Sequence, residues 1–542
     1  MKNPLKRLTA VVLAAGLLIA LSGCGCQSET DGNASEGTEA PKSTAESLPA
    51  APETESAVEA DAPGTEEGTE APETSGTEAA AADEAEPTIP ANVPVAEGLS
   101  YRDNGNGTCT LTGPGTWTGE HLKIPESIDG LTVTEVGTNA FRDSETLKSV
   151  TCPATLVGIR QCAFYNDPNL TNVVLNDGLQ WISDSVFAST GLYRMTFPAG
   201  ITNVGQYTFV SCKNLREVVL PEGVTKIGQN FCLGCEKLSR LILPESLEEI
   251  HGEAFFQCKS LTEVTLPDNV WRVDYYAFAE CENLKTLRLS KGMKRFDGDA
   301  LCGSGAVETF TIPENETYYI EGNCLIQKKD GVLAAGLDIS VIPDDGSVKA
   351  IGDKAFRERH GIKELALPSS IESIGIQAFK SCKGLKKITF PDGLKSIGEE
   401  AFRDCYSLTS LEIPDSVEKI GPSAFRYCDG LKTVKCGSGV REYKAQVFRE
   451  CYELVEADLG ENVETLGESL FWRCMKLQTL RLGKNVKKIS SDALQNCTAL
   501  KDIYYAGTMA EWKAVQASYG YDSSTGNYTV HCSDGDLKKG EK

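Results

Sequence analysis

The chain has 542 residues, more than one compact core usually holds, so several domains or a repeat array are expected. Its formal net charge of -24 argues against a nucleic-acid-binding protein, which needs clustered lysines and arginines. The excess negative charge is concentrated in residues 27–98, which hold 18 Asp and Glu residues against one lysine, Lys42. The negative net charge is therefore a property of this one segment and does not indicate an acidic functional surface.

Residues 1–24 are predicted to be a lipoprotein signal peptide. Cations at the N-terminus precede an apolar run, Leu8 to Leu21, which has the length of the hydrophobic region of a signal peptide and is too short to span a membrane comfortably. The sequence Leu21-Ser22-Gly23-Cys24 resembles a bacterial lipobox. The resemblance implies that Cys24 carries a lipid, which would hold the protein on the extracellular face of a bacterial membrane. An ordinary signal peptide cleaved near Gly23 is the alternative.

Residues 25–98 are predicted to be a disordered acidic linker. They consist mainly of Glu, Ala, Thr, Ser, Pro and Gly. Such a segment cannot bury enough apolar surface to offset the entropy that it would lose on ordering. A flexible chain of this length spans roughly 45–50 Å. A spacer between the membrane and the folded part is therefore expected, and an acidic recognition tail is the alternative.

A 23-residue repeat fills residues 99–506. Prolines recur at Pro198, Pro221, Pro244 and Pro267, each 23 residues after the one before. In the clearest units, Leu385 to Cys405 and Leu408 to Cys428, an LxxLxL-type run precedes the proline, and an Ile-Gly pair, an Ala-Phe pair and a cysteine follow it. The LxxLxL run predicts a short strand, and the proline ends it because proline cannot donate a hydrogen bond to a β-ladder.

Neighbouring units must complete one another's core. A lone unit loses roughly 35 kcal/mol of conformational entropy on ordering and cannot recover it alone. The Ile-Gly pair predicts a second short strand closed by a turn, and the Ala-Phe pair fills the far side of the core. The predicted fold class is therefore mainly β, a leucine-rich-repeat solenoid of about 16 coils of 23 residues that follows the disordered linker.

The columns of this repeat resemble the BspA-like leucine-rich-repeat proteins of bacterial surfaces. The resemblance covers residues 99–506 and is specific for the fold, but it is weak for the ligand. It implies a surface protein, since several members of that family are implicated in adhesion to host proteins or to other bacteria.

Three segments depart from the repeat. Residues 314–342 are too long for one coil and contain a turn-like Lys329-Asp330-Gly331, so a β-hairpin insert is predicted there, as a joint between two sub-arrays or as a ligand site. Residues 99–124 are expected to cap the start of the solenoid. Residues 507–542 are expected to cap its end with a helix over 509–517 and a strand over 528–532.

Most of the cysteines are predicted to be buried free thiols. Ten of them occupy one column of the repeat: Cys212, Cys235, Cys258, Cys281, Cys382, Cys405, Cys428, Cys451, Cys474 and Cys497. Neighbours in this column would lie about 4.8 Å apart with parallel Cβ directions, which is a poor geometry for a disulfide. Cys232 and Cys235 match CxxC, but Cys232 takes a phenylalanine position, so neither a redox centre nor a zinc site is expected.

No catalytic centre, cofactor or metal site is predicted. The four histidines lie in different coils, and no metalloprotease, phosphate-binding, serine-hydrolase or dinucleotide motif is present. The acidic residues do not fall in one column as a glycosidase pair would. An enzyme is therefore not expected.

Two surfaces are candidate ligand-binding sites. The outward positions of LxxLxL form a polar, partly basic sheet face with these cations: Arg216, Lys285, Arg288, Lys386, Lys387, Lys432, Lys435 and Arg481. Aromatic residues at turn positions form the second candidate surface: Phe256, Tyr276, Tyr427 and Trp472. Either set could instead be plain solvated surface or packing between coils.

The sequence thus predicts a surface-displayed protein that binds other molecules, through adhesion or protein–protein interaction. Its partner would be a protein or a glycan, with the membrane reached only through the lipid at Cys24. One alternative is an accessory lipoprotein that binds glycans or captures nutrients, which would need a groove of stacked aromatic rings. The other is a passive structural coat, which would show evenly mixed polar faces.

Overall fold

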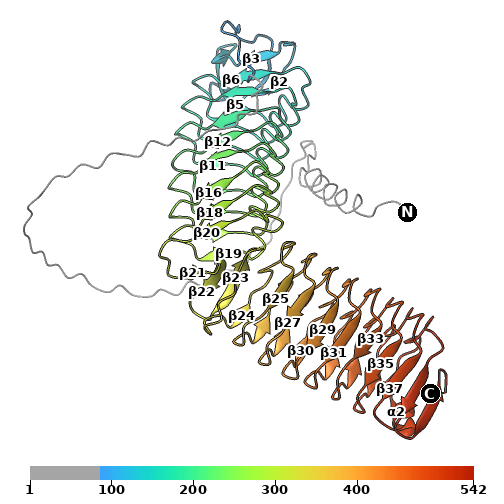
Figure 1. Ribbon diagram of the computed structural model, residues 1–542. Helices are drawn as coiled ribbons and strands as arrows, with labels where there is room; N and C mark the ends of the chain where they lie inside the picture. The colour runs from blue at the N-terminus through green and yellow to red at the C-terminus, as the bar shows by residue number, and fades with distance from the viewer. Residues whose placement is uncertain (1–85, 542) are drawn as a thin grey trace, which may run out of the picture. The chain divides into compact units, whose positions relative to one another are not determined.

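The computed structural model describes residues 86–541, and these form a β-solenoid of about 18 turns (Figure 1). The predicted fold class is confirmed, with nearly all regular structure in strands and slightly more turns than the 16 expected. The predicted signal peptide, Cys24 and most of the predicted linker lie outside the described residues.

Each coil contributes one strand to each of two series. The first series comes from the LxxLxL runs and consists of β3 (His121–Lys123), β6 (Ser149–Thr151), β8 (Asn172–Val174), β10 (Arg194–Thr196), β12 (Glu217–Val219), β14 (Arg240–Ile242), β16 (Glu263–Thr265), β18 (Thr286–Arg288), β20 (Thr309–Thr311), β25 (Glu364–Ala366), β27 (Lys387–Thr389), β29 (Ser410–Ile413), β31 (Thr433–Cys436), β33 (Glu456–Asp458), β35 (Thr479–Leu482), β37 (Asp502–Tyr505) and β39 (Thr529–Cys532).

The second series lies on another side of the coils, and half of its members end on the aliphatic residue that precedes a glycine. It consists of β5 (Leu131–Val136), β7 (Gly158–Ile159), β9 (Trp181–Ile182), β11 (Asn203–Val204), β13 (Lys226–Ile227), β15 (Glu249–Ile250), β17 (Arg272–Val273), β19 (Arg295–Phe296), β24 (Ala350–Ile351), β26 (Ser373–Ile374), β28 (Ser396–Ile397), β30 (Lys419–Ile420), β32 (Glu442–Tyr443), β34 (Thr465–Leu466), β36 (Lys488–Ile489) and β38 (Gln516–Ala517).

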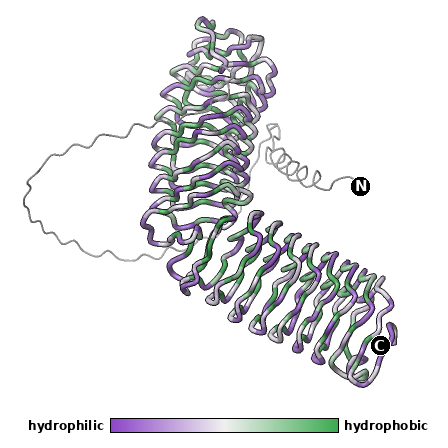
Figure 2. The backbone as a smooth tube through the Cα atoms, viewed as in Figure 1, coloured by the Kyte–Doolittle hydropathy of each residue, from purple (hydrophilic) through white to green (hydrophobic). Residues whose placement is uncertain are grey.

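Most successive coils pair in parallel with the same offset, and the coils at the two ends depart from it. Glu217 lies opposite Arg240 in the first series, and Lys226 lies opposite Glu249 in the second. Both offsets equal the 23-residue period, so every side chain stacks on its equivalent in the next coil. Figure 2 shows the result, with hydrophobic and hydrophilic positions recurring in successive coils.

The Ala-Phe pairs build the far side of the core. Phe356, Phe379, Phe402, Phe425, Phe448 and Phe471 form a continuous ladder of stacked rings with centroids 5.0–5.7 Å apart. The earlier ladder is interrupted, because Phe231 meets Phe209 and Phe255 edge-on at 84° and 79°. Cys232 takes the phenylalanine position in that coil, as the sequence indicates.

The cysteine column is buried and its thiols are free. Each thiol donates to a main-chain carbonyl of the preceding coil, as Cys428 does to Phe402 at 3.3 Å and Cys405 to Phe379 at 3.2 Å. Other residues take this position toward the start of the solenoid, among them the buried Asp167, whose Oδ1 accepts from the Ser144 amide at 2.7 Å. The thiol adds a second hydrogen bond to a carbonyl that already accepts one from a main-chain amide of its own coil, as the Phe402 carbonyl does from Cys405 at 3.3 Å.

The segment 314–342 forms a three-stranded antiparallel meander of β21 (Tyr318–Glu321), β22 (Cys324–Gln327) and β23 (Val332–Gly336). The Lys329-Asp330-Gly331 turn joins β22 to β23, and β23 pairs in parallel with β24. The flanking coils also contact one another directly, since the buried Asp299 carboxylate pairs with Lys354 at 2.9 Å and Arg357 at 3.3 Å. The insert thus joins two sub-arrays within one stack.

The N-terminal end begins earlier than the sequence indicates. Val95 bridges Lys123 in β3, and β1 (Ser100–Asp103) pairs with β2 (Thr108–Gly113) and through it with β5. The short β4 (Ser127–Ile128) also pairs with β5. Residues 86–98, assigned to the linker from sequence, therefore belong to the folded part.

The C-terminal end is closed by α2 (Met509–Ala514) and by β40 (Gly535–Lys538), which pairs antiparallel with β39. Thr508 and Glu511 form a capping box at the start of α2, and Trp512 is buried beneath it. β40 thereby becomes the edge strand of the sheet, and α2 packs against it.

Candidate functional site

The outward positions of the first strand series form the predicted sheet face, and in its first half one row of charges is paired. Arg194, Glu217 and Arg240 occupy the same position in successive coils, with ion pairs of 3.3 Å and 2.8 Å to the central carboxylate. Alternating charges in one row neutralise one another, so this half is not a basic strip.

The predicted cations of this half have individual surroundings. The Arg216 guanidinium lies 5.4 Å from the ring centroid of Tyr193. Arg288 lies 4.0 Å from Asp268, and Lys285 is exposed beside it in the same coil. These three residues do not form one continuous patch, because Ser239 and Thr262 take the corresponding positions in the coils between them.

The start of the sheet face is covered by the chain itself. Glu86 makes hydrogen bonds of 2.7–2.9 Å to Arg194, and the Pro87 carbonyl accepts from the Asn172 amide at 2.8 Å. Since Val95 pairs at β3, residues 86–95 cross the first coils over their outer face. The open part of the face therefore begins beyond β10.

The second half of the face carries four exposed lysines: Lys386, Lys387, Lys432 and Lys435, here called the lysine quartet. Within residues 86–541 none of the four takes part in an ion pair. Glu412 and Asp458 lie beside Lys435 in register, yet neither approaches it within ion-pair distance. The quartet therefore presents free ammonium groups interleaved with carboxylates.

Arg481 lies outside the quartet, and its charge, unlike those of the quartet lysines, is paired. Its guanidinium pairs with Glu456 at 3.0 Å and lies 4.6 Å from the ring centroid of Tyr504. Both contacts join neighbouring coils and occupy the guanidinium, so we assign Arg481 to the stack.

The predicted aromatic turn residues are covered by arginines. Tyr427 lies between Arg403 and Arg426, whose guanidinium carbons are 5.8 Å and 4.7 Å from its ring centroid. Trp472 lies between Arg449 and Arg473 at 4.2 Å and 4.5 Å. These rings pack between coils and are not open stacking platforms.

The other two aromatic candidates lie nearer the insert. Phe256 and Tyr276 contact one another edge-on with centroids 6.2 Å apart, and Arg357 covers the Tyr276 ring at 5.1 Å. Burial raises the pKa of the Tyr276 hydroxyl well above its ordinary value. The four aromatic candidates therefore do not join into one surface.

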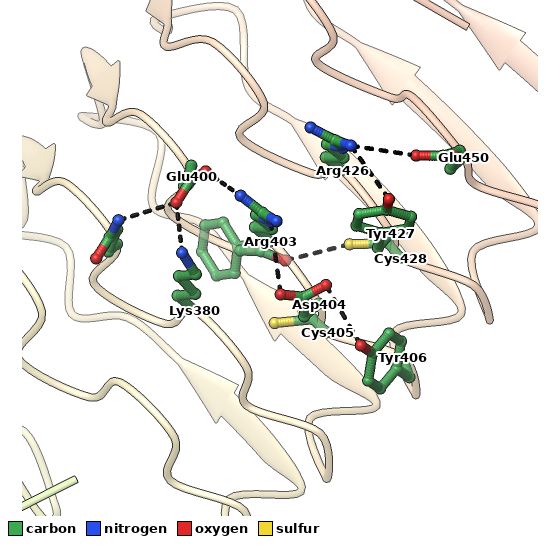
Figure 3. A network of polar contacts seen from close by, with 12 residues as sticks. Lys380, Glu400, Arg403, Asp404, Cys405, Tyr406, Arg426, Tyr427, Cys428 and Glu450 are labelled. Atoms are coloured by element: carbon green, nitrogen blue, oxygen red, sulfur yellow. Dashed lines mark hydrogen bonds and ion pairs between the residues drawn. The ribbon is translucent and has the colours of Figure 1, made fainter. Parts of the chain in front are cut away.

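The arginines belong to a ladder of ion pairs along the turns (Figure 3). Glu400 accepts hydrogen bonds from Lys380 at 2.6 Å and from Arg403. Burial favours the neutral acid, but these two cations outweigh it and hold the pKa of Glu400 below its ordinary value. In the next coils Arg426 donates to the Tyr427 hydroxyl at 3.1 Å and pairs with Glu450 at 3.4 Å.

The same turns hold the backbone in the left-handed region. Glu400, Asp404, Ser423 and Tyr427 have φ values of 51°, 64°, 56° and 60°. This geometry is strained for residues other than glycine, and the side-chain network around them helps to hold it. We therefore assign the turn network a structural role.

The thiols lack the features of reactive cysteines. Burial raises the pKa of Cys281 to about 12 and that of Cys382 to about 12, so the thiolate is scarce at neutral pH. Among residues 86–541 no group of three or more His, Cys, Asp or Glu side chains is placed to hold a metal ion.

The 23-residue coils match a known repeat. The description "BspA type Leucine rich repeat region" fits six copies over residues 120–237, 225–329, 349–477 and 436–514. Together these ranges include more than half of the chain. The chain belongs to the BspA-type leucine-rich-repeat family. The resemblance drawn from the sequence columns is therefore confirmed.

Solved structures of bacterial repeat proteins resemble this BspA-type chain. A leucine-rich cell surface protein of Faecalibacterium prausnitzii is 24% identical over 80% of this chain and 100% of its own, with a TM-score of 0.43. The pneumococcal vaccine antigen PcpA is 18% identical over 82% of this chain and 99% of its own, with a TM-score of 0.45. A leucine-rich-repeat protein of Bacteroides ovatus is 19% identical over 80% and 99%, with a TM-score of 0.38. No curated protein matches the chain.

One feature of this BspA-type chain escaped the sequence analysis. His251 approaches Glu249 at 3.4 Å and Asp274 at 3.6 Å, in the wall of a cavity of about 490 Å³. His251 and Asp274 come from successive coils and follow the second strands, where other coils have glycine. A comparison of this column along the solenoid would have revealed them. No helix among residues 86–541 is long and apolar enough to cross a membrane.

Proposed function

We propose that this protein is displayed on the bacterial surface, held by a lipid at Cys24, and that it binds a protein partner through the lysine quartet. The observation that carries the proposal is the contrast along the sheet face. Arg194, Arg240 and Arg481 form ion pairs with carboxylates of neighbouring coils, whereas none of the four quartet lysines forms an ion pair among the described residues. Exposed cations without partners are available to the carboxylates of another molecule.

The charge pattern favours a protein over a uniformly acidic glycan. Glu412 and Asp458 flank Lys435 in the neighbouring strands, so a chain with negative charge along its whole length would meet repulsion at every second coil. A folded partner can place carboxylates over the lysines and neutral or basic groups over the acids. The groove of stacked aromatic rings needed for the glycan-binding alternative is not formed by Tyr427 and Trp472, since arginines cover both rings.

A charge-reversal series tests the binding surface. The chain from residue 25 onward is offered to arrays of host and bacterial proteins, and the strongest ligand is titrated at several salt concentrations. Reversing the quartet, with Lys386→Glu, Lys387→Glu, Lys432→Glu and Lys435→Glu, is expected to weaken binding at least tenfold and to reduce its salt dependence.

The matched control reverses four other lysines, which do have carboxylate partners: Lys395, Lys444, Lys476 and Lys487. It changes the net charge by the same amount. If binding survives reversal of the quartet, or falls equally in the control, the sheet face is not the binding surface.

The anchor has its own test. Cells that express the full chain are fed an alkyne-labelled fatty acid, and the label is expected in the protein and lost in Cys24→Ser. Retention of the label in the variant would place the lipid on another residue or contradict lipidation at Cys24.

A further inference from the structure

Three successive coils place a histidine or an aspartate at a position that is glycine in half of the coils. The position follows the last residue of the second strand and is glycine at Gly205, Gly228, Gly352, Gly375, Gly398, Gly421 and Gly467. A Cβ at Gly398 would lie 2.5 Å from the Gly375 carbonyl carbon, so these two glycine-bearing coils meet too closely for a side chain. His251, Asp274 and Asp297 hold this position in consecutive coils, after β15, β17 and β19.

Ion pairs link these side chains to the strands before them. Arg272 donates to Asp274 at 2.7 Å and to Glu249 at 3.3 Å, and Lys226 pairs with Glu249 at 3.1 Å. The carboxylate side chains are 9% exposed at Glu249 and 5% at Asp274. His251 lies between the two carboxylates and is 31% exposed. The buried charges therefore neutralise one another.

A cavity of about 490 Å³ opens beside this cluster, within the size range of small-molecule sites. Coils from β9 to β17 line it. Its wall includes three carboxamides, two threonine hydroxyls and the His251 ring, together with Lys226, Arg272, Asp184 and Asp274. The carboxamides are Asn203, Gln206 and Gln229, and the hydroxyls are Thr202 and Thr225.

One aromatic ring borders the cavity. Tyr275 lies over Gly252, where a Cβ would come within 2.5 Å of the ring carbon Cζ, so the glycine makes room for the ring. Its hydroxyl accepts a hydrogen bond from the Gln229 amide at 3.1 Å. The ring is thereby fixed as part of the wall.

From this chemistry we propose that the cavity binds a neutral saccharide unit. Lys226 and Arg272 are occupied by Glu249 and Asp274, which leaves neither a free cation for an anionic ligand nor a free buried carboxylate for a cationic one. The remaining groups are amides, hydroxyls and an imidazole, which both donate and accept hydrogen bonds, and the Asp184 carboxylate, which accepts from the Gln206 main-chain amide at 2.8 Å and can also accept from a sugar hydroxyl. Sugar hydroxyls have the same dual capacity, and the Tyr275 ring adds an apolar face.

This site lies beyond the proposed docking surface. The cavity is lined by the second strand series before the insert, whereas the lysine quartet lies on the first strand series after it. Loss of binding at one of these two sites therefore does not imply loss of binding at the other.

The test uses the full chain and an array of neutral oligosaccharides: glucans, mannans, galactans and N-acetylhexosamine oligomers. The strongest ligand is then titrated against two variants. His251→Gly restores the residue of the regular coils, and Gln229→Leu removes one donor and one acceptor at similar volume. Each is expected to weaken binding at least tenfold. Matched controls are Ser490→Gly, at the same coil position, and Gln516→Leu, at the first position of β38, and both are expected to bind normally.

A spectroscopic measurement locates the ligand. The chain has four histidines, so an imidazole-labelled sample gives few resonances, and His251→Gly identifies one of them. The saccharide is expected to shift that resonance and to leave the other three unchanged. The absence of any neutral ligand on the array, undiminished binding in both variants, or no shift at His251 would each overturn the proposal. Reversal of the lysine quartet is expected to leave saccharide binding unchanged, which separates this test from that of protein docking.

Discussion

The coils after the insert and those before it use the same repeat in different ways. From Phe356 to Phe471 every ring stacks on the next, and the position after the second strand is mostly glycine. In the coils from Phe209 to Phe255 the ring ladder breaks, and His251 takes a glycine position next to the cavity. The regular coils show which residues the stacking of coils requires, namely stacked phenylalanines and a glycine after the second strand. Departures from them mark the positions where side chains are free to serve another purpose.

The largest difference between the coils before and after the insert is expected in the stacked phenylalanine rings. Phe402 is fully buried between two stacked rings, so Phe402→Ala is expected to lower the free energy of unfolding by about 3–5 kcal/mol. Phe231→Ala is expected to have a smaller effect, because a site whose rings already meet edge-on can collapse more easily. Guanidinium unfolding measures both. A larger loss in Phe231→Ala would contradict the idea that the ladder is tighter after the insert.

One position of the cysteine column is expected to make the free energy of unfolding depend on pH. At Asp167, which holds the cysteine position in an early coil, burial raises the carboxyl pKa to about 8. The folded state therefore keeps the proton up to about pH 8, while the unfolded carboxyl ionises near pH 4, so stability falls as the pH rises through this window. Asp167→Asn is expected to remove the fall and to be more stable by at most about 3 kcal/mol at pH 6.

Thermal unfolding between pH 4 and pH 8 measures this effect. Asp429→Asn is the control after the insert, because burial raises the pKa of Asp429 only to about 6 and its window is correspondingly narrower. Parallel pH profiles for the wild-type chain and Asp167→Asn would show that Asp167 is not the source of the dependence.

A smaller effect is expected within the cysteine column itself. Cys428→Ala removes the thiol that donates to the Phe402 carbonyl and is expected to lower the free energy of unfolding by about 1 kcal/mol. Cys428→Ser is expected to keep the hydrogen bond, as Ser304 does at the same position of an earlier coil by donating to Phe278 at 2.7 Å. Equal losses in the two variants would show that the bond contributes nothing beyond packing.

The smallest effect is expected at the turns. Arg473 covers one face of the Trp472 ring and is half-exposed, so Arg473→Ala is expected to lower stability by about 0.5–1 kcal/mol. Trp472 fluorescence follows the exposure of the ring in the same experiment. An unchanged spectrum together with unchanged stability would remove the structural role assigned to this contact.

The strands, the core and the cysteine column could be predicted because they depend on residue type at a fixed period. Leu411, Phe425 and Cys428 are buried wherever the repeat places them. The quartet could be identified as a set of outward lysines, but its freedom from carboxylates could not. Pairing depends on which rotamers the residues 23 positions away adopt, and no periodicity encodes that.

Other features depend on contacts that the repeat does not specify. Glu86 reaches Arg194 across more than a hundred residues of sequence, so the folded start of the chain escaped the sequence analysis. Arginines cover Tyr427 and Trp472, although the same spacing fits open aromatic platforms equally well. The cavity residues form no sequence motif, and they stand out only beside the equivalent residues of other coils.

The segment over the first coils also decides how the solenoid responds to force. Tension applied to the chain upstream of residue 86 reaches β10 through Glu86 and Arg194 before it reaches β3, where Val95 is paired. The force would first break the few polar contacts of residues 86–95 with the outer face, one after another. The hydrogen bonds between coils would not yet bear the force. A short stretch of chain can therefore lengthen and yield before any coil of the stack begins to open.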